Sequence, residues 1–151
     1  PTLASLVAIA TMARVCLAQR PGGARADVEE YIGRPLPDVT VVDADGRPFT
    51  LSALRGSYSV VTFGCLTWPP FLRNVSRVDT VYRDYAPKGV RDYYVYRRLA
   101  HPDLNGYIDP HTLEERPMHV REARRTLGSE TTWLADTMET DVERAVWASE
   151  P

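Results

Sequence analysis

The sequence predicts an α/β fold in which a central mixed sheet is flanked by helices. Residues 58–63 form a continuous apolar run that is typical of a strand buried on both faces. Apolar residues then recur at helical spacing after Pro69 and Pro70. Further strands and helices alternate towards the C-terminus, which is typical of parallel βαβ units with right-handed crossovers.

Local signals along the chain predict the individual elements. Two short β runs, 38–42 and 47–51, flank a turn in which Gly46 supplies a positive φ. A helical turn over 52–56 precedes the buried strand. The later elements are a helix from Pro70 to residue 85, a strand over 90–96, a helix from a capping box at 112–115 to residue 127, a strand over 132–135 and a helix over 141–147.

The segment over residues 60–71 carries the clearest chemical signal. It runs from the buried strand through Gly64 to Cys65, and then into a helix that opens with two prolines. A thiol near a helix N-terminus is favoured as the thiolate, because the helix dipole and the free N–H groups stabilise negative charge. This layout is typical of a thiol redox site on a thioredoxin-like fold. That fold closes with a β-hairpin and a C-terminal helix, which we expect to be missing from this chain.

The length of 151 residues predicts one domain with a substantial core, preceded by a separate segment. Residues 3–18 are apolar and small apart from Arg14, and a linker rich in Pro, Gly and Arg follows up to residue 26. Residues 1–26 thus resemble the apolar region of a signal peptide or a short anchor, and an amphipathic helix packed on the domain is the alternative. We predict a folded domain over 27–151 that is exported or associated with the membrane of a cell envelope, with a cytoplasmic location as the alternative.

Composition and charge exclude several classes of function. The net charge of −2 provides no electrostatic footprint for nucleic acid. Cys16 and Cys65 lie far apart in different contexts, so they predict neither a disulfide framework nor a metal cluster. The three histidines lack acidic or thiol partners at the spacing of metal ligands. We therefore predict no metal and no bound cofactor.

Two motifs carry a resemblance to a known family. Residues 63–71 read FGCLTWPPF and are similar to the active-site segment of the iodothyronine deiodinases, FGSxTUPPF, in which U is selenocysteine. Tyr96 and residues 100–107, AHPDLNGY, resemble the tyrosine and the AHPxDGW block of the same family. Bacterial deiodinase-like proteins of the redoxin group, with FGCLTCPPF, are more similar still. The resemblance covers roughly residues 33–148.

The resemblance implies roles for several residues. Position 68 is the family's nucleophile, a selenocysteine that takes iodonium from an iodinated phenol ring and is then reduced by a thiol; Trp68 cannot do this chemistry. Cys65 matches the bacterial cysteine that would resolve an oxidised partner, and His101 matches a histidine that assists at the substrate. The family's acidic residue two positions earlier is Leu99 here. The remaining motif residues are expected to contact the substrate: Thr67, Pro69, Pro70, Phe71, Tyr96 and Tyr107.

Several of these residues have more than one interpretation. Trp68 is either native, an engineered replacement, or a selenocysteine codon read as tryptophan. Cys65 is either a surviving redox thiol or a buried structural cysteine. For His101 the family role is preferred over that of a loop residue that caps backbone groups. Tyr93 and Tyr94 are interpreted as ordinary strand aromatics on opposite faces, and His111 and His119 as surface residues.

We therefore predict a deiodinase-like thiol or selenol oxidoreductase whose activity is reduced or lost because Trp68 occupies the nucleophile position. One alternative is a thiol peroxidase or disulfide reductase of the redoxin group. The other is a non-enzymatic binding domain in which Trp68 fills the former active-site groove. The expected partners are a small-molecule substrate (an iodinated phenol, a peroxide or a disulfide) and an external thiol reductant, and a homodimer is possible within the family.

Overall fold

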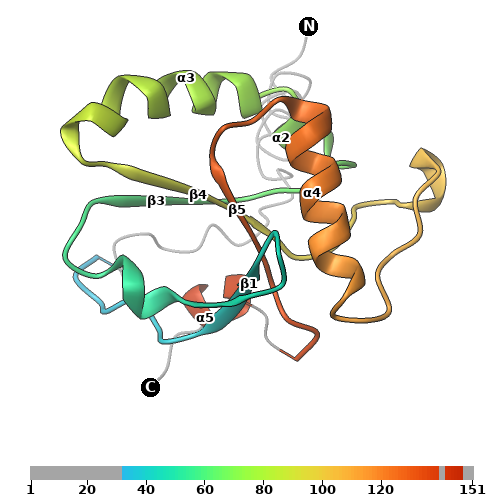
Figure 1. Ribbon diagram of the computed structural model, residues 1–151, viewed down its shortest axis with the longest axis horizontal. Helices are drawn as coiled ribbons and strands as arrows, with labels where there is room; N and C mark the ends of the chain where they lie inside the picture. Colours follow the sequence, from blue (N-terminus) through green and yellow to red (C-terminus); the bar gives the residue numbers. More distant parts are fainter. Residues whose placement is uncertain (1–31, 140–141, 148–151) are drawn as a thin grey trace, which may run out of the picture. The chain divides into compact units, whose positions relative to one another are not determined.

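Five strands form one mixed sheet in the computed structural model, which describes residues 32–139 and 142–147 (Figure 1). The strand order is β2-β1-β5-β4-β3. The five strands are β1 (Thr40–Asp43), β2 (Pro48–Thr50), β3 (Ser59–Phe63), β4 (Arg91–Tyr96) and β5 (Thr132–Ala135). Strands β3, β4 and β5 are parallel to one another, whereas β1 is antiparallel to both β2 and β5. The predicted α/β fold with a mixed sheet is confirmed. The predicted N-terminal segment, residues 1–26, lies outside the described residues.

Strands β1 and β2 form the expected hairpin, and hydrogen bonds within the turn stabilise it. The carboxylate of Asp43 accepts hydrogen bonds from the backbone N–H groups of Asp45 and Arg47, at 2.8 and 2.9 Å. Gly46 has a φ of 80°, the left-handed conformation that the turn requires. A short 3-10 helix, η2 (Leu51–Leu54), follows directly.

The strand expected to be central lies at the edge of the sheet, and this corrects the prediction for residues 58–63. Within the described residues, β3 pairs with β4 alone, and Tyr58 and Val60 are 85% and 48% exposed. The continuously buried strand is β4, in which every residue from Asp92 to Tyr96 is buried. The reason is topological, because β5 pairs with the side of β4 away from β3 and thereby makes β4 the interior strand.

The helices differ from the prediction in two ways: one expected helix is divided in two, and another begins later than expected. The single helix expected after Pro69 is two helices, α2 (Pro69–Leu72) and α3 (Val75–Tyr85), and Asn74 between them donates a hydrogen bond to the carbonyl of Pro70 at 2.8 Å. Helix α4 (Glu115–Leu127) begins at the last residue of the expected capping box. The Glu115 carboxylate accepts from the backbone N–H groups of His111 and Thr112, at 2.6 and 3.1 Å. The remaining helical elements are η3 (Ala86–Lys88), η4 (Asp103–Asn105) and α5 (Val142–Trp147).

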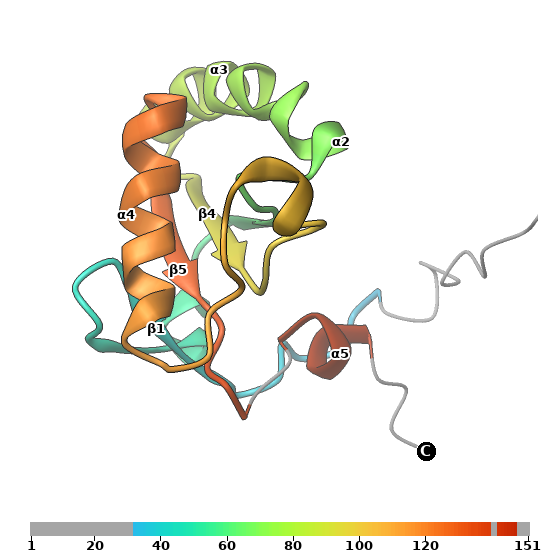
Figure 2. The same ribbon diagram turned by 90° about the vertical axis from the view of Figure 1, so that its right-hand side faces the viewer.

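Helices lie on both faces of the sheet (Figures 1 and 2), and each face carries its own apolar core. On one face, Tyr94 and Trp133 pack with residues of α2, α3 and α4. On the other face, Tyr93 and Leu134 pack with η2 and α5. This confirms that Tyr93 and Tyr94 are strand aromatics on opposite faces. No helix among the described residues has the length and apolar character needed to cross a membrane.

Candidate functional site

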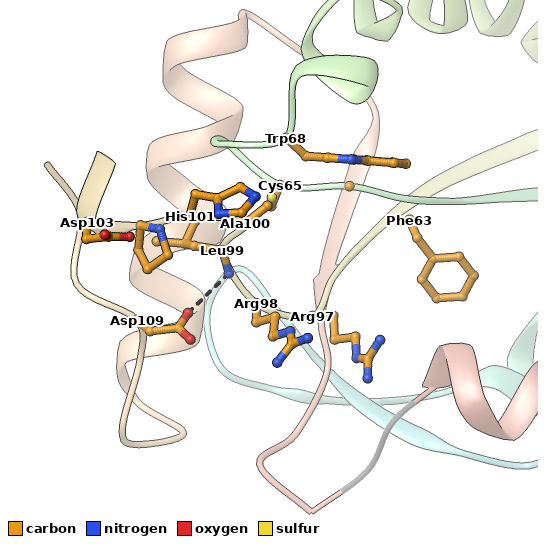
Figure 3. A pocket seen from close by; sticks show the side chains of 12 residues that line it. Phe63, Cys65, Trp68, Arg97, Arg98, Leu99, Ala100, His101, Asp103 and Asp109 are labelled. Carbon is orange, nitrogen blue, oxygen red and sulfur yellow. Dashed lines mark hydrogen bonds between the residues drawn. The ribbon is translucent and has the colours of Figure 1, made fainter. Parts of the chain in front are cut away.

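A pocket of about 640 Å³ opens where the carboxyl ends of β3 and β4 meet (Figure 3). One wall comes from the segment that follows β3 and includes Cys65 and Trp68. The other wall comes from the residues that follow β4, Arg97 to Asp103, together with Asp109. Parallel strands end at a common edge, and the loops that leave this edge are where α/β proteins usually place their sites.

Cys65 lies at the floor of this pocket. The side chain is only 4% exposed, and its Sγ lies 3.5 Å from Oγ1 of the buried Thr67. The strand ladder continues up to this point, because Gly64 donates its N–H to the carbonyl of Val95 at 3.2 Å. The thiol is thus held at a fixed position against the end of the sheet.

Gly64 and Phe71, both in the 63–71 motif, are in close contact, so the size of one residue limits the other. A Cβ at Gly64 would lie 2.2 Å from the ring of Phe71, which is closer than any real contact. The Phe71 ring itself packs edge-on against Tyr94 and Trp133, with ring centres 5.2 and 5.7 Å apart. Phe71 therefore anchors α2 on the sheet, and only glycine fits beneath it.

Trp68 immediately precedes α2 and lines the pocket with a side chain that is 45% exposed. Its backbone is extended, with φ −96° and ψ 107°, and Pro69 opens the helix after it. Proline is favoured at this position because backbone N–H groups in the first turn of a helix have no acceptor within the helix. Proline, which lacks the N–H, therefore loses no hydrogen bond there. An indole at this position provides contact area for a ligand but no nucleophile.

His101 reaches the same pocket from the loop after β4. Its φ of 51° is the only positive φ of a non-glycine residue in the described ranges, so the backbone is strained at this position. Asn105 stabilises the turn by donating its side-chain amide to the carbonyl of His101 at 2.9 Å. Asp109 holds the start of the loop, because its Oδ1 accepts the N–H of Leu99 at 3.2 Å. The strain is therefore stored beside the pocket.

A second imidazole lies behind this pocket, and it was expected at the surface. His119 on α4 is partly buried, and its Nδ1 lies 2.8 Å from the hydroxyl of Tyr96. Burial lowers the pKa of His119, and burial together with the charge of Asp109 raises the pKa of Tyr96. The ring of Tyr107 also packs edge-on to His119, with ring centres 6.3 Å apart. Tyr96, Tyr107 and His119 thus form one cluster of packed rings, in which Tyr96 and His119 are hydrogen-bonded.

The structure brings together only some of the residues expected at the site. Cys65, Trp68 and His101 line one pocket. Thr67 and Phe71 are buried, while Pro69 and Pro70 are exposed; none of these four residues lines the pocket. Four residues that line the pocket were not among the expected site residues, namely Arg97, Arg98, Asp103 and Asp109. The only feature of the sequence that could have identified these four residues is their position, because they directly follow a predicted parallel strand or belong to the loop after it. Within the described ranges, no group of three or more His, Cys, Asp or Glu side chains could hold a metal ion.

Comparison with known proteins identifies the fold. No family model and no curated protein matches the sequence. Among solved structures, an uncharacterized conserved protein from Geobacillus kaustophilus is similar at 22% identity and a TM-score of 0.57, covering 77% of this chain and 57% of that chain. The chain thus spans little more than half the length of that protein.

Two further similar structures are thiol redox proteins. A thiol:disulfide interchange protein from Bacteroides sp. has 17% identity and a TM-score of 0.55, covering 72% of this chain and 60% of that chain. The thioredoxin domain of a thiol-disulfide oxidoreductase from Bacteroides vulgatus has 18% identity and a TM-score of 0.54, covering 76% and 69%. At these identities the likeness establishes the fold, which is thioredoxin-like as predicted.

Proposed function

We propose that this domain is a thiol-dependent oxidoreductase in which Cys65 is the reacting group and an external thiol supplies the electrons. The observation that carries the proposal is the position of Cys65, the one free cysteine among the described residues, on the floor of the pocket at the carboxyl ends of β3 and β4. The fold that this chain shares with thiol:disulfide proteins supports the same chemistry. The proposal follows the disulfide reductase alternative more closely than the deiodinase interpretation.

The proposed reaction is thiol–disulfide exchange with a small disulfide. The Cys65 thiolate attacks one sulfur of RS–SR, so that a Cys65–SR mixed disulfide forms and RS⁻ leaves. A reductant thiolate R′S⁻ then attacks the sulfur of the bound SR group, which forms RS–SR′ and releases the Cys65 thiolate. A small substrate is expected because Cys65 is only 4% exposed in a pocket that Trp68 also lines.

Neighbouring groups fit this chemistry. The Thr67 hydroxyl, 3.5 Å from Sγ, is placed to donate a hydrogen bond to the thiolate. His101 is exposed in the pocket and is placed to protonate the leaving RS⁻. Arg97 and Arg98 add positive charge to the same wall, which favours thiol compounds that carry a carboxylate.

A finer proposal assigns the domain to the deiodinase-like redoxins. Support comes from the two segments that carry the resemblance, residues 63–71 and 96–107, because together they supply most of the residues around this pocket. In this assignment position 68 is the nucleophile position, so we expect little or no release of iodide from an iodinated phenol with Trp68 present. Export to a cell envelope and a homodimer belong to the same proposal; residues 3–18, on which export depends, lie outside the described residues.

A binding domain without turnover is the second candidate. Trp68 favours it, because an indole that is 45% exposed on a pocket wall is a suitable contact for an aromatic ligand. In that case ligand binding changes the fluorescence of Trp68, while Cys65 does not react.

The first test compares cysteine variants in an exchange assay. The reduction of bis(2-hydroxyethyl) disulfide by glutathione is followed with the wild-type protein, Cys65→Ser and Cys16→Ser. We expect Cys65→Ser to lose at least tenfold of the protein-dependent rate and Cys16→Ser to keep it. Equal rates for Cys65→Ser and the wild type would contradict the proposal and leave the binding domain as the better interpretation.

The finer proposal has its own test. Trp68→Cys creates Cys-x-x-Cys with Cys65, so we expect the exchange rate to rise and a reducible disulfide between residues 65 and 68 to form. Release of iodide from 3,5-diiodophenol is measured in parallel. Release by Trp68→Cys but not by the wild type supports the deiodinase-like assignment, whereas no release by either variant argues against it while leaving the Cys65 chemistry standing.

A further inference from the structure

The amino ends of β3 and β4 form a second hollow, at the end of the strands away from the Cys65 pocket. Here α3 covers the sheet only partly, and the exposed side chains of Tyr58, Val60, Val81 and Tyr85 gather around a groove of about 440 Å³. Tyr58 immediately precedes β3 and Val60 is its second residue, while Val81 and Tyr85 belong to the second half of α3. This volume is in the range of small-molecule sites, which run from about 300 to 1,000 Å³.

A buried carboxyl group lies at the floor of this groove. Asp92, the second residue of β4, lines the groove although the residue is only 4% exposed. Its Oδ1 has no hydrogen-bond partner among the described residues. Buried carboxyl oxygens in folded proteins are normally paired, so an unpaired oxygen on a residue that lines an apolar groove indicates a missing donor.

Within the described part of the chain, no cationic side chain forms an ion pair with Asp92. Arg91 precedes it in β4, but successive strand residues point to opposite faces, and the Arg91 guanidinium donates to the carbonyls of Ala53 and Leu54. On the side of α3, the carboxylate of Asp79 is close enough to act on Asp92 electrostatically. Burial first, and then the charge of Asp79, raises the pKa of Asp92. A hydrogen bond from the backbone N–H of Tyr93 partly offsets this rise. The Asp92 carboxyl group therefore keeps one donor, but its Oδ1 has none and no cation is paired with it among the described residues.

We propose that this groove binds a small organic amine, whose ammonium group pairs with Asp92 and whose hydrocarbon body packs on Val60, Val81 and Tyr85. An ammonium group supplies the donor and the positive charge that the floor lacks. The aromatic wall also favours a cation, and Nζ of Lys88 already lies 4.3 Å from the centre of the Tyr85 ring. An anion of the same shape would be repelled by Asp92 and Asp79.

The test uses phenethylamine as the probe and phenylacetate as its anionic counterpart, titrated at neutral pH by calorimetry. The wild-type protein is expected to bind phenethylamine saturably and phenylacetate at least tenfold more weakly. Asp92→Asn is expected to lose at least tenfold in affinity for the amine. Asp84→Asn, which removes an exposed carboxylate of α3, is the matched control and is expected to bind as the wild type does.

Two further variants test the groove through residues other than Asp92. Val81→Ser changes a wall residue that is 57% exposed, and it is expected to fold normally and to weaken amine binding severalfold. Cys65→Ser is expected to bind the amine unchanged, because that pocket lies at the other end of the strands. Equal affinities for the amine and the anion, or no saturable binding of the amine, would overturn the proposal. Self-association that Val81→Ser abolishes would identify a second copy as the occupant instead.

Discussion

At their carboxyl ends, β3 and β4 continue into loops that gather a thiol, an imidazole and two guanidinium groups, whereas at their amino ends the same strands present apolar side chains above one buried carboxyl group. The polar end is tightly packed beneath its pocket, because Phe71 fills the space over Gly64 and fixes α2. The apolar end stays open, since α3 leaves Val60 half exposed. The candidate reactive thiol therefore lies in a rigid frame, whereas the uncovered sheet face provides a surface for binding.

The largest effect is expected where the polar end is most tightly packed. Gly64→Ala places a Cβ against the Phe71 ring, 2.2 Å away in the present geometry, so α2 must shift. We expect the free energy of unfolding to fall by roughly 3 kcal/mol, as for overpacking in a rigid core. Urea denaturation measures it. Gly56→Ala, with a φ of 81° but an open surrounding, is the control and should cost about 1 kcal/mol. Equal costs would show that the Phe71 contact is not tight.

Asp79 is the corresponding anchor at the other end. Its Oδ1 accepts hydrogen bonds from three buried hydroxyl groups, those of Tyr94, Ser129 and Thr131, at 2.8, 3.2 and 3.0 Å. Asp79→Ala leaves these donors without their acceptor, and we expect a loss of about 2 kcal/mol in the free energy of unfolding. Asp84→Ala on the exposed side of α3 is the control in the same denaturation series. A loss below that of the control would mean that water replaces Asp79 without cost.

A change at the strained residue His101 is expected to have opposite effects on the exchange activity and on the stability of the fold. His101→Gly removes the imidazole and relieves the φ of 51°, so we expect the unfolding free energy to rise by about 0.5 kcal/mol. The rate of disulfide exchange should fall about tenfold if the imidazole transfers a proton. His111→Gly, at an exposed position before α4, is the control for the loss of a histidine alone. A more stable variant with full activity would confine His101 to a structural role.

The smallest expected effect is the pH dependence at the apolar end. Because the pKa of Asp92 is raised in the folded state, the unfolded chain loses this proton at a lower pH than the folded chain. Ionisation of Asp92 therefore favours unfolding as the pH rises above the unfolded value. Asp92→Asn should stabilise the protein at neutral pH, with the difference vanishing as the pH falls to the unfolded value near 3.8, and the pH dependence of urea denaturation measures it. A difference that is constant with pH would mean that Asp92 does not titrate as described.

Local signals predicted the elements that depend on neighbouring residues. The turn at 43–46 was predictable because Asp43 caps it and Gly46 takes the positive φ within four residues. The edge position of β3 was not, since it depends on β5 pairing with the far side of β4 across a long crossover. An apolar strand pattern cannot distinguish an interior strand from an edge strand whose outer face is uncovered.

The same limit applies to the candidate site. Cys65, Trp68 and His101 were identified from their motifs, and all three line one pocket. The contact between Tyr96 and His119 was missed because it joins β4 to α4 across 23 residues and requires the helix to dock on the sheet. Asp92 was missed because a carboxylate in an apolar strand gives no signal until its partners, or their absence, are visible.

The central claim, that Cys65 is the reacting group of this domain, is tested most directly by incubating the native protein with oxidised glutathione and identifying the mixed disulfide by peptide mass spectrometry. The account predicts that the tryptic peptide Gly56–Arg73, which contains Cys65, carries glutathione after native incubation, and that dithiothreitol removes it. A Cys65 that stays unmodified in the native protein and reacts only after denaturation would contradict the account and leave a buried structural cysteine in its place.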